Sequence, residues 1–301
     1  MKTKFLFLSL LALLGAETTM AQQDPIYAQY LTNPLVINPA YTAANDRLNT
    51  GIQYRTQWAG VDGNPVSMNF YSNISLVDNK VGAGILVMQD KIGDTKTTTF
   101  NTQYAYKIKL KDGTFSFGLQ AGFVRYSNDP SSLRVRDPND PNFVFFNDSK
   151  FNTGAGLLFK NERYMIGFSV PRLLPATVDQ GGQSIKLYDR NYYLMGAYQI
   201  YLTDRVRLKP SVLLRASGGS PLSVDLNMSL NLEDLYTVGI FTRNLNTYGI
   251  LFQMLVKHYR FGCVFEVPAS QASSLRYTSH ELTLNVSLAV LSFHNRSLTS
   301  F

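Results

Sequence analysis

The sequence lacks the features that mark several large classes of protein. Beyond its first residues it has no run of about 20 consecutive apolar residues, which excludes a membrane protein built from spanning helices. It has one cysteine, Cys263, which excludes an internal disulfide. Its three histidines, His258, His280 and His294, fall in different predicted parts of the chain and cannot form one metal site with that cysteine. No glycine-rich loop for a phosphate is present either. We therefore expect no metal, no cofactor and no enzymatic activity.

The first 21 residues have the pattern of a signal peptide. Lys2 and Lys4 give a positive start, an apolar stretch follows, and Thr19-Met20-Ala21 places small residues at the positions that signal peptidase requires. Without this segment the chain keeps 26 basic and 20 acidic residues. The basic residues lie mainly in turns and at alternating positions, without a single basic stripe, so we expect no nucleic-acid partner.

What the chain does contain, from about residue 48 onward, is alternation of apolar and polar positions in segments of roughly ten residues. In one segment the alternation is complete, with apolar residues on one face and polar residues on the other. The apolar face has Leu222, Val224, Leu226, Met228, Leu230 and Leu232, and the polar face has Ser223, Asp225, Asn227, Ser229, Asn231 and Glu233. A soluble sandwich also alternates, but its strands average about five or six residues. The longer segments, with 18 Tyr and 19 Phe in the chain, favour a transmembrane antiparallel up-and-down β-barrel.

Fourteen such segments can be counted, with starts near residues 48, 65, 81, 96, 113, 151, 163, 190, 205, 220, 236, 247, 258 and 279. Every second link is tight: Val77–Lys80, Lys111–Gly113, Lys160–Arg163, Thr203–Arg205, Glu233–Leu235 and Lys257–His258. The intervening links include the long stretches 127–150, 171–189 and 268–279. An even strand number with this arrangement predicts both termini and the tight turns in the periplasm and the long loops outside the cell.

The remaining regions do not have the pattern of barrel wall. Residues 22–47 contain three prolines and no period of two, and we expect an ordered N-terminal segment in the periplasm or the lumen. The segment either plugs the barrel or contacts a partner. In the long loop, the apolar patch Phe143–Phe146 suggests folding into the lumen or docking of a partner. The predicted division is therefore signal peptide 1–21, N-terminal segment 22–47, barrel 48–292 and tail 293–301.

The predicted interior is rich in cations. It includes Arg55, Lys107, Lys109, Arg125, Arg205, Arg207, Lys209 and Arg215 against the acids Asp225, Glu233 and Glu266. Such a lumen is compatible with an anion-selective pore, with a receptor for a peptide's carboxylates, or with a site for the chain's own N-terminal segment.

The N-terminal segment contains the motifs Gln23–Tyr30 (QDPIYAQY), Asn33 and Asn38–Tyr41 (NPAY). These motifs resemble the opening of the PorP/SprF family of Bacteroidetes outer-membrane proteins, and the resemblance extends to Gln53–Trp58, Gly63–Pro65 and Ser279–Leu282. The chain departs from the family pattern mildly, with Ala28 in place of a small hydroxyl residue and Thr42-Ala43 in place of Ala-Gly.

This resemblance implies a non-enzymatic barrel of the type IX secretion and gliding machinery. Such a protein supports export or surface attachment of a secreted adhesin-type protein, through the C-terminal secretion domain of that adhesin, and contacts periplasmic components as well as outer-membrane lipid. The expected partner-binding residues are Tyr27, Tyr30, Asn38, Pro39, Tyr41, Phe143, Phe145 and Phe146. Two alternatives remain at this point: a diffusion channel or small-solute transporter, and an outer-membrane hydrolase using His280-Glu281.

Overall fold

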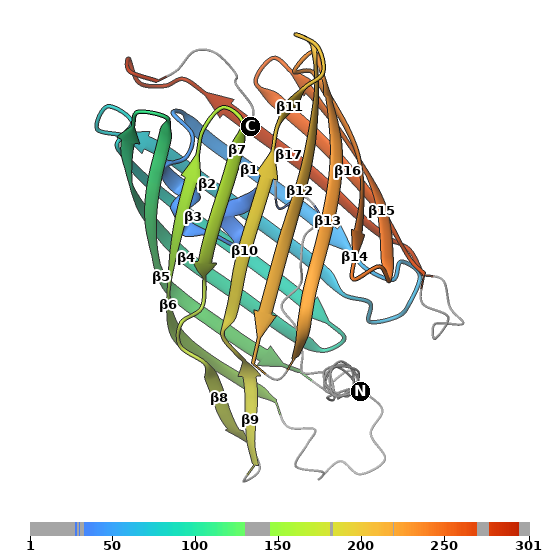
Figure 1. The fold of residues 1–301 in the computed structure, drawn as a ribbon. Helices are drawn as coiled ribbons and strands as arrows, with labels where there is room; N and C mark the ends of the chain where they lie inside the picture. The colour runs from blue at the N-terminus through green and yellow to red at the C-terminus, as the bar shows by residue number, and fades with distance from the viewer. Residues whose placement is uncertain are drawn as a thin grey trace, which may run out of the picture.

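The computed structural model describes residues 28, 30, 33–129, 145–180, 183–218, 220–269 and 277–294, with the backbone alone at 178–180 and 183–186. Its strands form one antiparallel sheet in which each wall strand pairs with the next along the chain, and β1 (Leu48–Thr56) pairs with β17 (Ser279–Leu288) to close the ring. Figure 1 shows this ring of tilted strands around a lumen. The predicted up-and-down barrel of about fourteen strands is thereby confirmed.

The remaining wall strands follow in chain order: β2 (Val66–Leu76), β3 (Val81–Ile92), β4 (Thr95–Leu110), β5 (Gly113–Asn128), β6 (Phe146–Lys160), β7 (Tyr164–Val170), β10 (Asn191–Tyr198), β12 (Val206–Ser217), β13 (Ser220–Leu232), β14 (Tyr236–Arg243), β15 (Thr247–Val256) and β16 (Tyr259–Pro268). The two-residue β11 (Ile200–Tyr201) continues β10 beyond Gln199, since both pair with β12. The wall therefore has fourteen strands.

The predicted strand starts lie within one residue of the observed ones, except in the sixth strand. That strand begins at Phe146, five residues earlier than expected, because residues 146–150 continue the ladder against Val124–Asn128 of β5. A second difference is a hairpin, β8 (Ala176–Gln180) with β9 (Gln183–Tyr188), inside the link predicted as a loop. It forms a separate two-stranded sheet that extends from the end of the wall (Figure 1).

The two ends of the barrel differ in their connections. At the end where β1 starts and β17 finishes, tight turns use left-handed backbone at Val77, Asp78, Asn79, Glu233 and Lys257, each with φ between 50° and 61°. At the other end lie the long links 129–145, 171–190 and 269–278, but also tight turns between β3 and β4 and between β14 and β15. The strict alternation of short and long links expected from the sequence is therefore incomplete.

The wall has an apolar outer face and a polar inner face. Ile52, Leu119 and Ile240 point outward and are 53%, 60% and 62% exposed, whereas the inward side chains of Gln53 and Asn69 are almost fully buried. A soluble protein would bury the first set and expose the second. A lipid environment supplies the missing cover for the outer face, because hydrocarbon tails are as apolar as these side chains. Among the described residues, no helix is long and apolar enough to cross a membrane.

The described residues that precede β1, namely 28, 30 and 33–47, lie inside the ring. They form two short 3₁₀ helices, η1 (Pro34–Val36) and η2 (Pro39–Ala43), and η2 packs against β2 to β6. Figure 1 shows this blue segment within the barrel. Leu35, Ile37 and Tyr41 share an apolar cluster with inward residues of the wall such as Leu158 and Met195, so the main apolar core of this barrel is built around the N-terminal segment.

Candidate functional site

The described residues of the N-terminal segment, 28, 30 and 33–47, run through the lumen from one end toward the other. The backbone N–H of Ala28 donates to Glu281 Oε2 at 3.0 Å, near the long-loop end of β17. The Arg47 guanidinium donates to the carbonyl of Ser287 at 3.0 Å, near the tight-turn end of the same strand. The segment therefore occupies the lumen along much of the length of β17.

Asn38 and Pro39 start η2 and attach it to the wall. Asn38 Oδ1 accepts from the N–H of Ala40 at 2.9 Å and so caps the helix, while Pro39 at the first helical position has no N–H to satisfy. Asn38 Nδ2 donates to the carbonyl of Leu157 in β6 at 3.0 Å. One side chain thus caps the helix and holds it against the wall.

Inward side chains of the wall recognise the backbone of the segment. Gln103 of β4 donates to the carbonyl of Leu35 at 3.0 Å, and Asn73 of β2 donates to that of Thr42 at 3.1 Å. Ser169 of β7 donates to the carbonyl of Ile37 at 2.6 Å. These bonds satisfy carbonyls that the short helices leave without an internal partner, which buried backbone requires.

Glycines in the wall let η2 approach the sheet. A Cβ added at Gly118 would lie 2.3 Å from the nitrogen of Ala40, and one added at Gly156 would lie 2.1 Å from Asn38 Oδ1. At Gly82 it would lie 2.4 Å from the carbonyl oxygen of Thr42. Because these neighbours are backbone or the capping amide, any larger residue at these positions would displace the helix.

In the half of the lumen toward the long loops, charges are paired. Arg55 makes two hydrogen bonds to Glu266, at 2.7 and 2.8 Å, and contacts Glu281 at 3.5 Å. Gln53 also donates to Glu281. All these side chains are buried, with Glu281 fully so. Bidentate geometry and added donors are what make such buried charges tolerable.

A second pair lies across the same half. Arg243 of β14 donates to both carboxylate oxygens of Asp225 of β13, at 3.0 and 3.2 Å. Tyr30 of the N-terminal segment is buried here, and burial together with the negative charge of Asp225 raises the pKa of its phenol. Tyr30 therefore stays neutral beside the ion pair.

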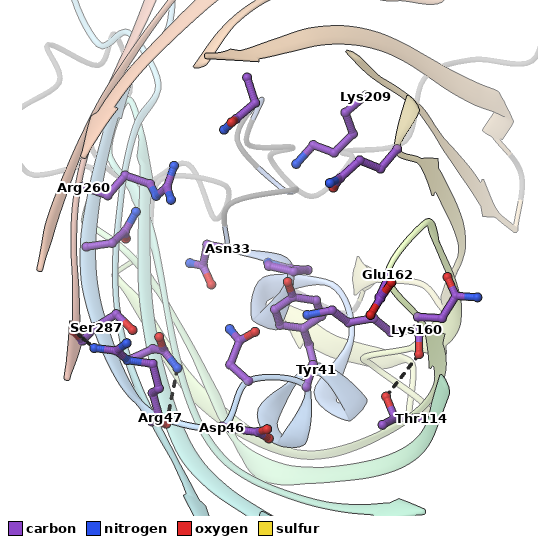
Figure 2. A pocket seen from close by; sticks show the side chains of 18 of the residues that line it. Asn33, Tyr41, Asp46, Arg47, Thr114, Lys160, Glu162, Lys209, Arg260 and Ser287 are labelled. Atoms are coloured by element: carbon purple, nitrogen blue, oxygen red, sulfur yellow. Dashed lines mark hydrogen bonds between the residues drawn. The ribbon is translucent and has the colours of Figure 1, made fainter. Parts of the chain in front are cut away.

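The other half of the lumen, at the tight-turn end, contains a cavity of about 1160 Å³. The N-terminal segment forms part of its lining with Leu35, Tyr41 and residues 44–47, and the ends of the wall strands form the sides. Figure 2 shows Lys160, Lys209 and Arg260 around this space on different sides, with Tyr41 at its floor, whereas Arg47 points to Ser287 on the wall. Burial raises the pKa of Tyr41 to about 12, so this part of the lining is uncharged.

The structure places the expected partner-binding residues in two groups. Tyr30, Asn38, Pro39 and Tyr41 are buried in the lumen, where they contact the chain's own wall. Phe145 is 61% exposed at the long-loop end, and the adjacent Phe146 packs partly against a cluster of Val124, Tyr126, Ala176 and Tyr188. Tyr27 and Phe143 lie outside the described residues. A partner-binding role for any of them stays a prediction.

The expected interior charges are corrected at three positions. Arg125 points to the outer face, where it donates to Asn147 Oδ1 at 2.9 Å, because the inward positions of β5 are the even-numbered ones. Arg205 and Glu233 are exposed in the tight turns and lie 3.4 Å apart. Sequence reasoning missed Lys160 and Arg260, which line the cavity, although each has the parity of the inward residues on its strand.

Among the residues that the structure describes, the His280-Glu281 pair does not form a catalytic arrangement. His280 and Glu281 are neighbours on one strand and point to opposite faces, with the ring of His280 5.2 Å from that of Phe265 outside. Within the described part of the chain, no group of His, Cys, Asp and Glu residues could hold a metal ion. The lumen instead provides hydrogen bonds for backbone and, at one end, positive charge.

Comparisons with known proteins agree with this picture. The model of the family described as "Type IX secretion system membrane protein PorP/SprF" matches residues 19–286. No curated protein matches. Among solved structures, a TodX deletion mutant, described as a monoaromatic hydrocarbon channel, is similar at 10% identity with a TM-score of 0.51, covering 87% of this chain and 94% of that one. Omp33 of Acinetobacter baumannii is similar at 7% identity with a TM-score of 0.48, covering 80% and 98%.

The likeness to TodX concerns the barrel fold alone, since the identity is low. The family match covers most of the chain and includes both N-terminal motifs from which the resemblance was inferred, as well as the lumenal segment that they build. This chain belongs to the PorP/SprF family and is an outer-membrane component of the type IX secretion system.

Proposed function

We propose that this barrel supports export or surface attachment of a secreted adhesin-type protein, held through that protein's C-terminal secretion domain, while its tight-turn end contacts periplasmic components. The observation that carries the proposal is the N-terminal segment bound across the lumen. The N-terminal segment is bonded to wall strands on several sides and shares their apolar core. A lumen occupied in this way suits a docking platform better than a conduit for free solutes.

The long-loop end supplies a surface for the secreted partner. Here the β8–β9 hairpin is fixed to the wall by Tyr188, which stacks on Tyr126 at 5.9 Å and lies under the guanidinium of Arg172 at 5.0 Å. The exposed Phe145 lies beside this cluster. Tyr126 and Tyr188 are themselves buried, so this cluster holds the hairpin on the wall, and the exposed Phe145 beside it fits an apolar contact with a protein partner.

Deletion of the gene tests the proposal. We expect one adhesin-type protein to disappear from the cell surface, measured by mass spectrometry of proteins released by an external protease, and to return with the wild-type gene. Complementation with Phe145→Ser should restore less surface protein than the control Leu245→Ser, an equally exposed apolar residue in a tight turn at the same end. Unchanged surface display in the deletion strain would overturn the proposal.

A diffusion channel remains the second candidate, favoured only by the cavity. It requires a continuous path past the N-terminal segment. Steady single-channel conductance of the purified wild-type protein in planar bilayers would support it, and an electrically silent barrel would eliminate it.

A further inference from the structure

The cavity at the tight-turn end carries a strong excess of positive charge. Nine lysine and arginine side chains line it among the described residues, against three carboxylates. Two of those carboxylates, Asp112 and Glu162, belong to exposed turns at the rim. The third, Asp46, forms an ion pair with Lys107. The potential inside the cavity is therefore positive, and low-dielectric walls strengthen it.

The cations surround the cavity. Lys107 and Lys109 come from β4, Lys160 from β6, Lys209 from β12 and Arg260 from β16. Arg207 of β12 also lines the cavity and forms an ion pair with Asp234 in the adjacent tight turn. Each occupies an inward position on its strand, so these charges face the lumen. Figure 2 shows cationic side chains on opposite sides of the space. Such an arrangement favours a ligand that enters the cavity, and the wall separates these charges from lipid headgroups around the barrel.

The size and the neutral lining indicate the kind of anion. A volume of about 1160 Å³ exceeds the several hundred Å³ of a typical small-molecule site and is much larger than a single phosphate needs. Between the cations lie amides such as Asn45, Gln199 and Asn227. Amides offer donors and acceptors for a peptide backbone, and the same lumen already holds the backbone of the N-terminal segment through Asn73 and Gln103.

We propose that this cavity binds a carboxylate-rich peptide segment of a periplasmic protein, inserted from the tight-turn end. The cations bind its carboxylates, and the amides bind its backbone. The inference rests on the proposed function in one respect, the contact with periplasmic components, and it identifies the chemistry of that contact.

Binding of a labelled peptide to the full barrel in neutral detergent tests it. The probe is a short Glu-rich peptide, and the matched probe has Gln at each Glu position. Fluorescence anisotropy should show binding of the Glu-rich peptide alone, with an affinity that falls as salt is added. Equal binding of both peptides would overturn the proposal, and so would displacement of the Glu-rich peptide by an equal concentration of inorganic phosphate, which would indicate a simple anion site.

Charge variants locate the site. Lys109→Glu with Lys111→Glu should weaken binding at least tenfold, whereas the control, Lys91→Glu with Lys96→Glu, changes the net charge equally at the opposite end and should bind like wild type. Lys91 and Lys96 are exposed and paired across β3 and β4. The neutral double variant Lys109→Gln with Lys111→Gln should give an intermediate loss of peptide affinity. It replaces the glutamate variant in the test if the glutamates prevent folding. Equal loss in the control would overturn the assignment.

The outcome is separable from that of the proposed function. Loss of the surface protein on gene deletion, together with no peptide binding, would refute the peptide site alone. Peptide binding with unchanged surface display would refute the export role and leave the peptide site standing.

Discussion

The two halves of the lumen are built from the same strands but differ in whether their charged side chains are paired. Toward the long loops, Arg55 faces Glu266 and Glu281, and Arg243 faces Asp225, so buried charges meet opposite charges. Toward the tight turns, the described residues place many cations and few acids around the cavity. Between the two, η2 is bonded to the wall.

The contrast distinguishes charges that stabilise the fold from charges that are available to a ligand. Paired charges that are buried or nearly so contribute to one defined arrangement of strands and N-terminal segment, and they leave little for a ligand to bind. Same-sign charges around the cavity repel one another, which opposes folding, and a bound anion would offset that repulsion. The following changes should break or sharpen this contrast, beginning with the largest effect.

Arg55→Ala should have the largest effect, because it leaves Glu266 and Glu281 buried without their cation. We expect the free energy of unfolding to fall by about 3–5 kcal/mol, measured by denaturant titration in lipid or detergent. Arg205→Ala is the control, since its ion pair with Glu233 is exposed, and it should cost less than about 1 kcal/mol. A similar loss of unfolding free energy in both variants would show that the buried ion pairs stabilise the fold no more than the exposed one does.

Gly118→Ala should disturb the boundary between the halves. The added methyl carbon would lie 2.3 Å from the backbone of η2, so the helix must move, at about 1–3 kcal/mol. We expect raised single-channel conductance, because the N-terminal segment no longer fits against β5. At Gly196 the same methyl would meet only Val212, at 3.6 Å, and Gly196→Ala should behave as wild type. Unchanged conductance for Gly118→Ala would argue against a tightly fitted segment.

Asn38→Ala should act on the same boundary more gently. It removes the cap of η2 and the bond to Leu157, for about 1–2 kcal/mol. The comparison is Asn64→Ala, which removes two hydrogen bonds to Thr56 and Gln57 in the β1–β2 loop. Limited proteolysis should release fragments of the N-terminal segment in the first variant only; cleavage in both or in neither would contradict the assigned role of Asn38.

Lys109→Gln with Lys111→Gln should have the smallest effect on stability. Both side chains are exposed to the cavity or its rim, so we expect a change within about 0.5 kcal/mol by the same titration. A loss comparable to that of Arg55→Ala would mean that the cavity cations hold the fold together, and the contrast between the halves would disappear.

The wall of the barrel could be predicted from the sequence because lipid imposes a period of two on every strand. The alternation of Leu222 to Leu232 persists along the whole of β13. Alternation no longer identifies a strand beyond the part of the wall that faces lipid. Residues 146–150 extend β6 with polar residues on both faces, so no alternation marks them. The β8–β9 hairpin was not predicted from the sequence because it lies beyond the wall, where lipid imposes no alternation.

The site was predictable only in part. Asn38-Pro39 announces a turn in the sequence, and the three prolines indicate an ordered path. The wall residues that contact this segment depend on the register between strands, which the sequence does not give. Gly118 and Gly156 both contact η2 because they are directly paired across β5 and β6. Arg125 was misplaced for a related reason, since Gly122 and Val124 leave the parity of β5 ambiguous in sequence.

The lumenal segment also constrains how the molecule is assembled. Ala28 and Arg47 are both bonded to β17, the strand made last, and β17 completes the wall against β1, the strand made first. These two attachments of the lumenal segment therefore form only once β17 is in place. The strand that closes the wall against β1 is also one that anchors the segment inside it.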